Sequence, residues 1–404
     1  MRFRVLEVIR QFAQEQLRDA GQEHSARTAH AAHYAVEAGR AAEGLRSRDR
    51  EAWLDALAHD HAQYRAALEW SFGRNRGDEA LRIGAALGPF WASRGYDLEG
   101  AAWLARLLDA GADPTVRHRA TAANAAAVAL ANLGRYQEAG TYCELAERLA
   151  YRTQDDWELL EALLTQTRLA VLRRDRATAE RLVTRTTTLA VDGRFGRQLG
   201  WSHRWAAQIA AAEGRWEDAT PDRLLAGFRL LVLAGDRNGA AQIAALGAAV
   251  AASQGDLPSA SDWAGKAGDI SPGYERSPAG ILATVVQSIV ELRRGMLEQA
   301  RALALQTLDR AQDRGLTVGL VLGLEATAGV AIASGNPELG VLLWGKAEGL
   351  RKEIGYPPPA FEVAPFAPEL DGARAQLGTE RFRELLEQGH HAPLDHALDG
   401  ARRV

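Results

Sequence analysis

Apolar positions along this chain recur at the spacing of a helix. In the stretch 48–72, one helix face carries the apolar residues Trp53, Leu54, Leu57, Tyr64, Ala67 and Leu68. The same spacing predicts helices over 5–19 and 24–43. Alanine and leucine are abundant, and runs of valine, isoleucine and threonine are scarce, which favours helix over strand. We therefore expect an all-α protein.

A short motif repeats through the chain at a nearly constant interval. It has a turn residue, usually glycine, then an aromatic, apolar or proline residue two positions on and a small residue five positions on. The copies begin at Gly95, Gly134, Arg174, Gly214, Gly255, Gly295 and Gly335. Successive copies start 39 to 41 residues apart, and an interval of this length is typical of repeat architectures.

The motif has the chemistry of a turn between two helices. Glycine ends the first helix because a left-handed residue there has no Cβ penalty. The small residue, such as Ala139 or Ala219, lets the two helices cross closely. A single hairpin cannot bury its apolar face alone, so the hairpins must stack.

This Gly-x-aromatic-x-x-Ala pattern resembles the tetratricopeptide family. The resemblance implies a right-handed α-solenoid of helical hairpins with a period of about 40, longer than that family's usual 34. HEAT-like repeats also run near 40 residues, so the subclass stays open. We expect a helical N-terminal cap over 1–75, a tetratricopeptide-like solenoid over 76–355, and a proline-rich link with a C-terminal helical cap over 356–404. In that last region we expect a non-helical proline segment, one helix over 369–387 and a polar tail.

Longer segments resemble the sensor region of bacterial STAND-type NTPase transcriptional regulators, including LuxR-associated and MalT-like ones. The start, MRFRVLEVIRQFAQEQL, looks like the end of a winged helix and its linker. The segment 50–72 is similar to the one that follows, with Trp53, Leu54 and Asp60 and then QYRAALEW. The segments LLWGKAEGLRKEIGYPPP and LGTERFRELLEQG look like the close of that region. Such regulators carry an NTPase core and often a DNA-binding domain, and this chain has neither, so we expect a truncated product or an isolated sensor arm.

Charge and composition exclude several classes of partner. The net charge of -4 argues against direct nucleic-acid binding, which needs clustered cations. The single cysteine, Cys143, cannot form an internal disulfide, and the start has no apolar signal region; both favour the cytoplasm. The apolar stretch 316–334 contains Glu325 and fits the repeat register, so we expect a buried helix there and no membrane span.

No catalytic, cofactor or metal motif is complete. The segment 340–347 is close to a Walker A signature, but Ala347 replaces the hydroxyl that would hold magnesium. His30 and His33 could share a helix face without a third ligand nearby, and His390 and His391 fall in the expected polar tail. We interpret Cys143 as a packing residue. The sequence predicts no catalytic residue, no cofactor and no metal site, and it favours a non-enzyme.

The candidate binding surface is the concave groove of the expected solenoid. Counting back from each hairpin turn places eight residues on that face: Asn124, Glu161, Arg168, Trp201, Arg204, Gln208, Gln242 and Glu325. The stretch WSHRWAAQ at 201–208 is the centre of this prediction, because aromatic and arginine side chains are common anchors for ligands. The alternative is that Trp201 and Trp205 are core residues between hairpins.

The sequence leaves two functions open. The first is a sensor and interaction module of a signal-responsive transcriptional regulator, with a protein, a peptide or a small-molecule effector in the groove. The second is a free-standing scaffold that joins protein partners without regulatory output.

Overall fold

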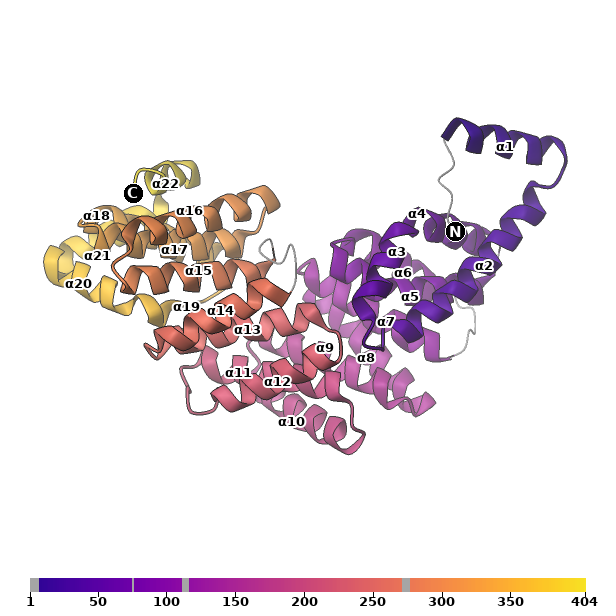
Figure 1. The fold of residues 1–404 in the computed structure, drawn as a ribbon, viewed down its shortest axis with the longest axis horizontal. Helices are drawn as coiled ribbons and strands as arrows, with labels where there is room; N and C mark the ends of the chain where they lie inside the picture. Colours follow the sequence, from indigo (N-terminus) through magenta and orange to yellow (C-terminus); the bar gives the residue numbers. More distant parts are fainter. Residues whose placement is uncertain (1–6, 75, 111–115, 271–276) are drawn as a thin grey trace. The chain divides into compact units, whose positions relative to one another are not determined.

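The computed structural model describes residues 7–74, 76–110, 116–270 and 277–404. Throughout these residues the chain forms helices, and no strand occurs among them (Figure 1). This confirms the all-α prediction. The chain divides into two compact units, Met1–Gln198 and Leu199–Val404, and the boundary falls in the first turn of a helix. The segment 1–6, which carries the start of the winged-helix resemblance, lies outside the described residues.

The first unit is built from consecutive helices that pack on their neighbours in the chain. Its helices are α1 (Glu7–Asp19), α2 (Glu23–Gly44), α3 (Arg50–His59), α4 (His61–Gly73), α5 (Gly77–Arg94), α6 (Asp97–Asp109), α7 (Val116–Asn132), α8 (Tyr136–Thr153), α9 (Asp156–Leu172) and α10 (Arg176–Asp192). The helices α2 and α4 pack directly on α5, so the N-terminal helices share a core with the helices that follow.

The second unit continues in the same manner. Its helices are α11 (Gly196–Ala212, beginning at the boundary), α12 (Pro221–Leu233), α13 (Arg237–Ser253), α14 (Leu257–Ile270), α15 (Pro278–Arg293), α16 (Leu297–Arg314), α17 (Thr317–Ala333), α18 (Pro337–Glu353), α19 (Ala360–Val363), the 3-10 helix η2 (Ala364–Phe366), α20 (Ala367–Leu377), α21 (Thr379–His391) and α22 (Leu394–Ala401). In addition to sequence neighbours, α13 packs on α15 and α15 packs on α17, as in stacked hairpins.

The turn residues of the motif adopt the left-handed backbone conformation. All seven positions, from Gly95 to Gly335, have φ between 60° and 87°. A second set of left-handed residues lies about 20 positions after a motif residue, at Gln154, Arg194, Gly235, Gly315 and Gly355. The sequence did not reveal this second set as a series, because Gln154 and Arg194 interrupt its glycines.

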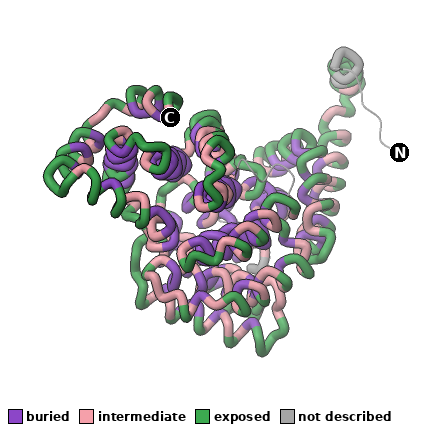
Figure 2. The backbone as a smooth tube through the Cα atoms, turned by 60° about the vertical axis from the view of Figure 1, so that its left-hand side comes forward, coloured by how far each residue is buried: buried purple, intermediate pink, exposed green. Residues whose placement is uncertain are grey.

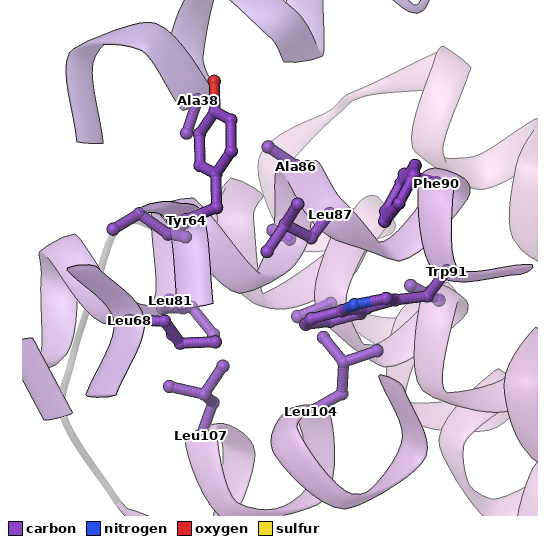
Figure 3. Close-up of a cluster of buried hydrophobic side chains, with 14 of the residues drawn as sticks. Ala38, Tyr64, Leu68, Leu81, Ala86, Leu87, Phe90, Trp91, Leu104 and Leu107 are labelled. Atoms are coloured by element: carbon purple, nitrogen blue, oxygen red, sulfur yellow. The ribbon is translucent and has the colours of Figure 1, made fainter. Parts of the chain in front are cut away.

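Small residues fill the places where helices cross. Ala139, Ala179, Ala219, Ala260 and Ala300 are all at most 1% exposed. Buried positions recur along nearly every described helix (Figure 2). In the first unit, side chains from α2, α4, α5 and α6 meet in one apolar cluster around Phe90 and Trp91 (Figure 3).

The single helix expected over 48–72 is wrong. The chain bends at Asp60, which ends α3 and precedes α4. The bend allows Leu57 on α3 and Tyr64 on α4 to enter the same core, where both are at most 5% exposed.

The C-terminal region also differs from the prediction. The proline segment was expected to be non-helical, but it contains α19 and η2, and Pro365 and Pro368 lie in the first turns of η2 and α20. Proline is tolerated there because a first-turn N–H has no helical partner. The expected helix over 369–387 is two helices, α20 and α21. The expected polar tail contains α22, which buries Leu398 and Ala401 and packs on α17 and α18.

The apolar stretch at 316–334 forms α17, which is largely buried by neighbouring helices, as predicted. Among the described residues, no helix combines the length and the apolarity needed to cross a membrane.

The closest helix crossing in the second unit supplies a test. A Cβ at Gly389 of α21 would overlap the backbone oxygen of Leu342 on α18. We expect Gly389→Ala to lower the free energy of unfolding by about 1–3 kcal/mol, because rigid backbone has to move. Gly372→Ala is the matched control: Gly372 lies within helix α20 with open space around it, so alanine there should be neutral or stabilising. Denaturant unfolding of both variants measures the difference, and equal effects would contradict the packing argument.

Candidate functional site

Trp201 and Arg204 lie next to each other on α11, in the second unit. Both are partly exposed. The Arg204 guanidinium carbon lies 5.7 Å from the centre of the Trp201 ring and 4.1 Å from that of Trp205. Trp205 is 7% exposed and belongs to the core. A cation over an aromatic face contributes about 0.5–2 kcal/mol depending on solvation, so the pair is held in a defined arrangement.

The position of Trp201 is fixed from α13. Its indole Nε1 donates a hydrogen bond of 2.9 Å to Asp236 Oδ2. The other oxygen of Asp236 caps α13 by accepting from the backbone N–H of Gly239. A Cβ at Gly239 would lie 2.9 Å from the indole ring, so glycine at this position makes room for Trp201. Trp201 therefore packs against the core of this unit while part of its ring stays exposed, and for Trp205 the core interpretation holds.

The remaining polar candidates of the second unit are Gln208 and Gln242, and both are half-buried. Gln208 lies one helical turn beyond Arg204 on the same face of α11. Gln242 is on α13, where its side-chain amide contacts Asn238 Oδ1 at 3.4 Å. The candidate surface of this unit therefore consists of Trp201, Arg204 and Gln208, with Gln242 on α13.

Glu325 does not belong to an open surface, and its assignment to the binding groove is wrong. Its side chain is 1% exposed, and both of its carboxylate oxygens accept hydrogen bonds from Arg351, at 2.8 and 2.9 Å. Burial raises the pKa of Glu325 to about 7, although the Arg351 charge opposes the shift. A carboxylate enclosed in this way cannot contact a ligand from solvent.

The three candidates of the first unit lie in separate surroundings. Glu161 on α9 accepts hydrogen bonds from Arg197 and from the side-chain amide of Gln198, at 2.5 and 2.9 Å. Arg168 is half-buried; burial lowers its pKa, and the charge of Asp97 opposes that shift. Asn124 on α7 is 9% exposed, and its Oδ1 has no hydrogen-bond partner among the described residues.

A surface hollow in the first unit was not found from the sequence. It has a volume of about 630 Å³ and lies between the ends of α8 and α10 and the start of α9. Arg185 lines it, forms an ion pair with Glu147 at 3.0 Å and lies 5.6 Å from the Tyr151 ring centre. Tyr151 and Arg185 are on different hairpins, so no local sequence pattern joins them.

The residues with possible reactive chemistry are in structural positions. The segment 340–347 lies inside α18, where Lys346 is 7% exposed, so its backbone cannot form a phosphate-binding loop. Cys143 is 1% exposed, and burial raises the pKa of its thiol to about 12, which keeps it protonated. In the part of the chain that the structure describes, no three His, Cys, Asp or Glu side chains are grouped as metal ligands.

The raised pKa of Glu325 predicts a specific pH dependence. The folded state binds this proton more tightly than the unfolded state, whose carboxyl titrates near 4.5. The stability from this group is therefore fully present below pH 4.5 and is lost as pH rises to about 7. We expect Glu325→Gln to make the free energy of unfolding fall less steeply across that window. Unfolding measured at several pH values checks this, with the exposed Glu217 changed to Gln as control; parallel profiles for all three proteins would contradict it.

Comparison with known protein families and with curated proteins finds no match to this chain. The resemblance to the sensor region of STAND-type regulators therefore remains an expectation from packing motifs.

Proposed function

We propose that this chain is a binding module: a right-handed, tetratricopeptide-like solenoid with a period of about 40 that holds a protein, a peptide or a small-molecule effector. In this proposal it acts in the cytoplasm as the sensor and interaction part of a signal-responsive transcriptional regulator. Binding shifts a conformational equilibrium in favour of the state that holds the ligand more tightly. The chain itself performs no catalysis and needs no cofactor.

The observation that carries this proposal is the partly exposed Trp201–Arg204 pair on α11. Its two side chains are stacked and anchored by Asp236 and Trp205, so little side-chain entropy remains to be lost on binding. Aromatic and arginine residues supply much of the energy at protein interfaces. The stacking of helices on their neighbours supports a scaffold for binding, since solenoids present extended surfaces.

The test compares two charge reversals in the full-length chain. Arg204→Glu should remove binding of partners that the unchanged chain retains from an extract of its source, because it removes the stacked cation. Arg229→Glu is the matched control, since Arg229 is exposed on the neighbouring helix α12 and undergoes the same change of charge. We expect at least a tenfold loss of affinity for Arg204→Glu only, with thermal midpoints nearly unchanged in both variants. Equal losses from both, or a loss of stability with Arg204→Glu, would make Arg204 a scaffold residue.

The alternative is a free-standing scaffold without regulatory output. The two proposals predict different sequences upstream of the gene, because the sensor arm of such a regulator follows an NTPase core. An in-frame NTPase sequence directly upstream of the codon for Met1 would support the regulator, and an unrelated upstream gene would favour the scaffold.

A further inference from the structure

The segment 357–369 of the second unit, called the strap here, lies across the ends of two helices that are far from it in sequence. The hydroxyl of Ser253, the last residue of α13, donates to the backbone oxygen of Phe361 at 3.5 Å. Arg293, the last residue of α15, donates to the backbone oxygen of Pro365 at 2.7 Å and binds the carboxylate of Glu369. The helices α19 and α20, which contain most of the strap, lie beside α13, α17 and α18 (Figure 1).

Two aromatic side chains of the strap enter two different apolar clusters. Phe361 is 5% exposed and joins the cluster built mainly from α13 and its neighbours. Phe366 is 1% exposed, joins the cluster around α15, α17 and α18, and lies 5.7 Å from the Trp344 ring centre. A Cβ at Gly329 would lie 2.9 Å from the Phe366 ring, so glycine on α17 leaves the space that this ring fills.

Two glutamates of the strap are bound by arginines of the helices. Glu369 pairs with Arg293. Glu362 accepts a hydrogen bond of 2.8 Å from Arg351, which also holds Glu325, and one of 2.6 Å from the hydroxyl of Tyr356. The helices therefore offer two apolar recesses and two cations, and the strap supplies two phenylalanines five positions apart and two carboxylates.

The strap enters each of the two cores through one buried aromatic ring, and Phe366 is among the largest fully buried side chains of the described residues. Each of the two clusters takes one strap phenylalanine among buried residues that come otherwise from longer helices. The charge balance at Arg351 is also incomplete. Two carboxylates share one guanidinium, burial raises the pKa of both, and Arg351 Nη1 has no hydrogen-bond partner among the described residues. The strap is thus held by two ring anchors and two charged contacts to other helices, which are the kinds of contact that hold a bound peptide.

We propose that this surface, formed by the ends of α13 and α15 with α17 and α18, is a peptide-binding site that the strap occupies in cis. A partner chain that fits it carries the same chemistry: two aromatic side chains five positions apart, followed or flanked by carboxylates. The strap is tethered at an effective concentration of the order of millimolar, so a free peptide enters only when the strap is weakened. The site is separate from the Trp201–Arg204 surface and does not depend on the function proposed for it.

The test exchanges a charge pair between the site and its occupant. Arg293→Glu in the full-length chain places two carboxylates opposite each other and should release the strap. The probes are fluorescent synthetic peptides of residues 356–371, one unchanged and one with Glu369→Arg. The changed peptide should bind the Arg293→Glu protein at least about tenfold more tightly than the unchanged peptide does. The unaltered protein should bind each of the two peptides at least about tenfold more weakly than the Arg293→Glu protein binds the changed peptide.

Hydrogen exchange and a double variant complete the experiment. Hydrogen exchange in 357–369 should accelerate in Arg293→Glu and return to the original rate in the double variant Arg293→Glu/Glu369→Arg. The double variant should again bind both peptides as weakly as the unaltered protein does. Accelerated exchange without peptide binding would overturn the proposal, because the surface would then not recognise a peptide. Unchanged exchange, or loss of folding in Arg293→Glu, would also overturn it, because the strap would then be part of the core. Arg204→Glu should leave every one of these measurements unchanged.

Discussion

The close crossing of neighbouring helices is the constraint on which the rest of this structure depends. A hairpin of two amphipathic helices cannot remove its apolar face from water alone, so each hairpin must be covered by the next. Close coverage requires small side chains where helices cross. The buried residue five positions after each motif turn supplies them: it is alanine at five turns, and glycine at Gly100 and Gly340. At the tightest crossing, between α18 and α21, only glycine fits at Gly345 and Gly389, since a Cβ would meet backbone of the other helix.

The same close packing buries carboxyl groups between hairpins and raises their pKa values. Glu158 and Glu325 are both at most 3% exposed, and burial raises the pKa of each to about 7. Each is bound by an arginine from a different helix or loop, Arg46 and Arg351 respectively. A buried ion pair is weak evidence for stability, because desolvation offsets its attraction, but breaking one partner is costly. The main effect of these pairs is therefore on which segments meet, and their net contribution to the free energy of unfolding is small.

The sequence was sufficient to predict the all-α class and the seven turns of the motif, because both depend on local chemistry. Apolar spacing predicted an all-α chain, and the seven motif positions have the left-handed backbone that their role requires. Contacts between distant residues could not be predicted in this way. Glu325 was assigned to an open groove because its partner Arg351 and their neighbour Glu362 lie 26 and 37 positions further along the chain. The proline segment was expected to be a link because nothing local indicates that Phe361 and Phe366 are buried.

The candidate surfaces of the second unit therefore differ in what occupies them. Around Arg293 and Arg351, carboxylates of the same chain neutralise the guanidinium groups, and aromatic rings fill the adjoining recesses. At α11, the Arg204 guanidinium stacks on indole rings, and Trp201 and Arg204 both keep part of their surface exposed to solvent. A cation over an aromatic face keeps its net charge, whereas a bound carboxylate neutralises that charge. The α11 surface is therefore partly exposed and keeps its positive charge, whereas the strap surface is covered by a segment of its own chain.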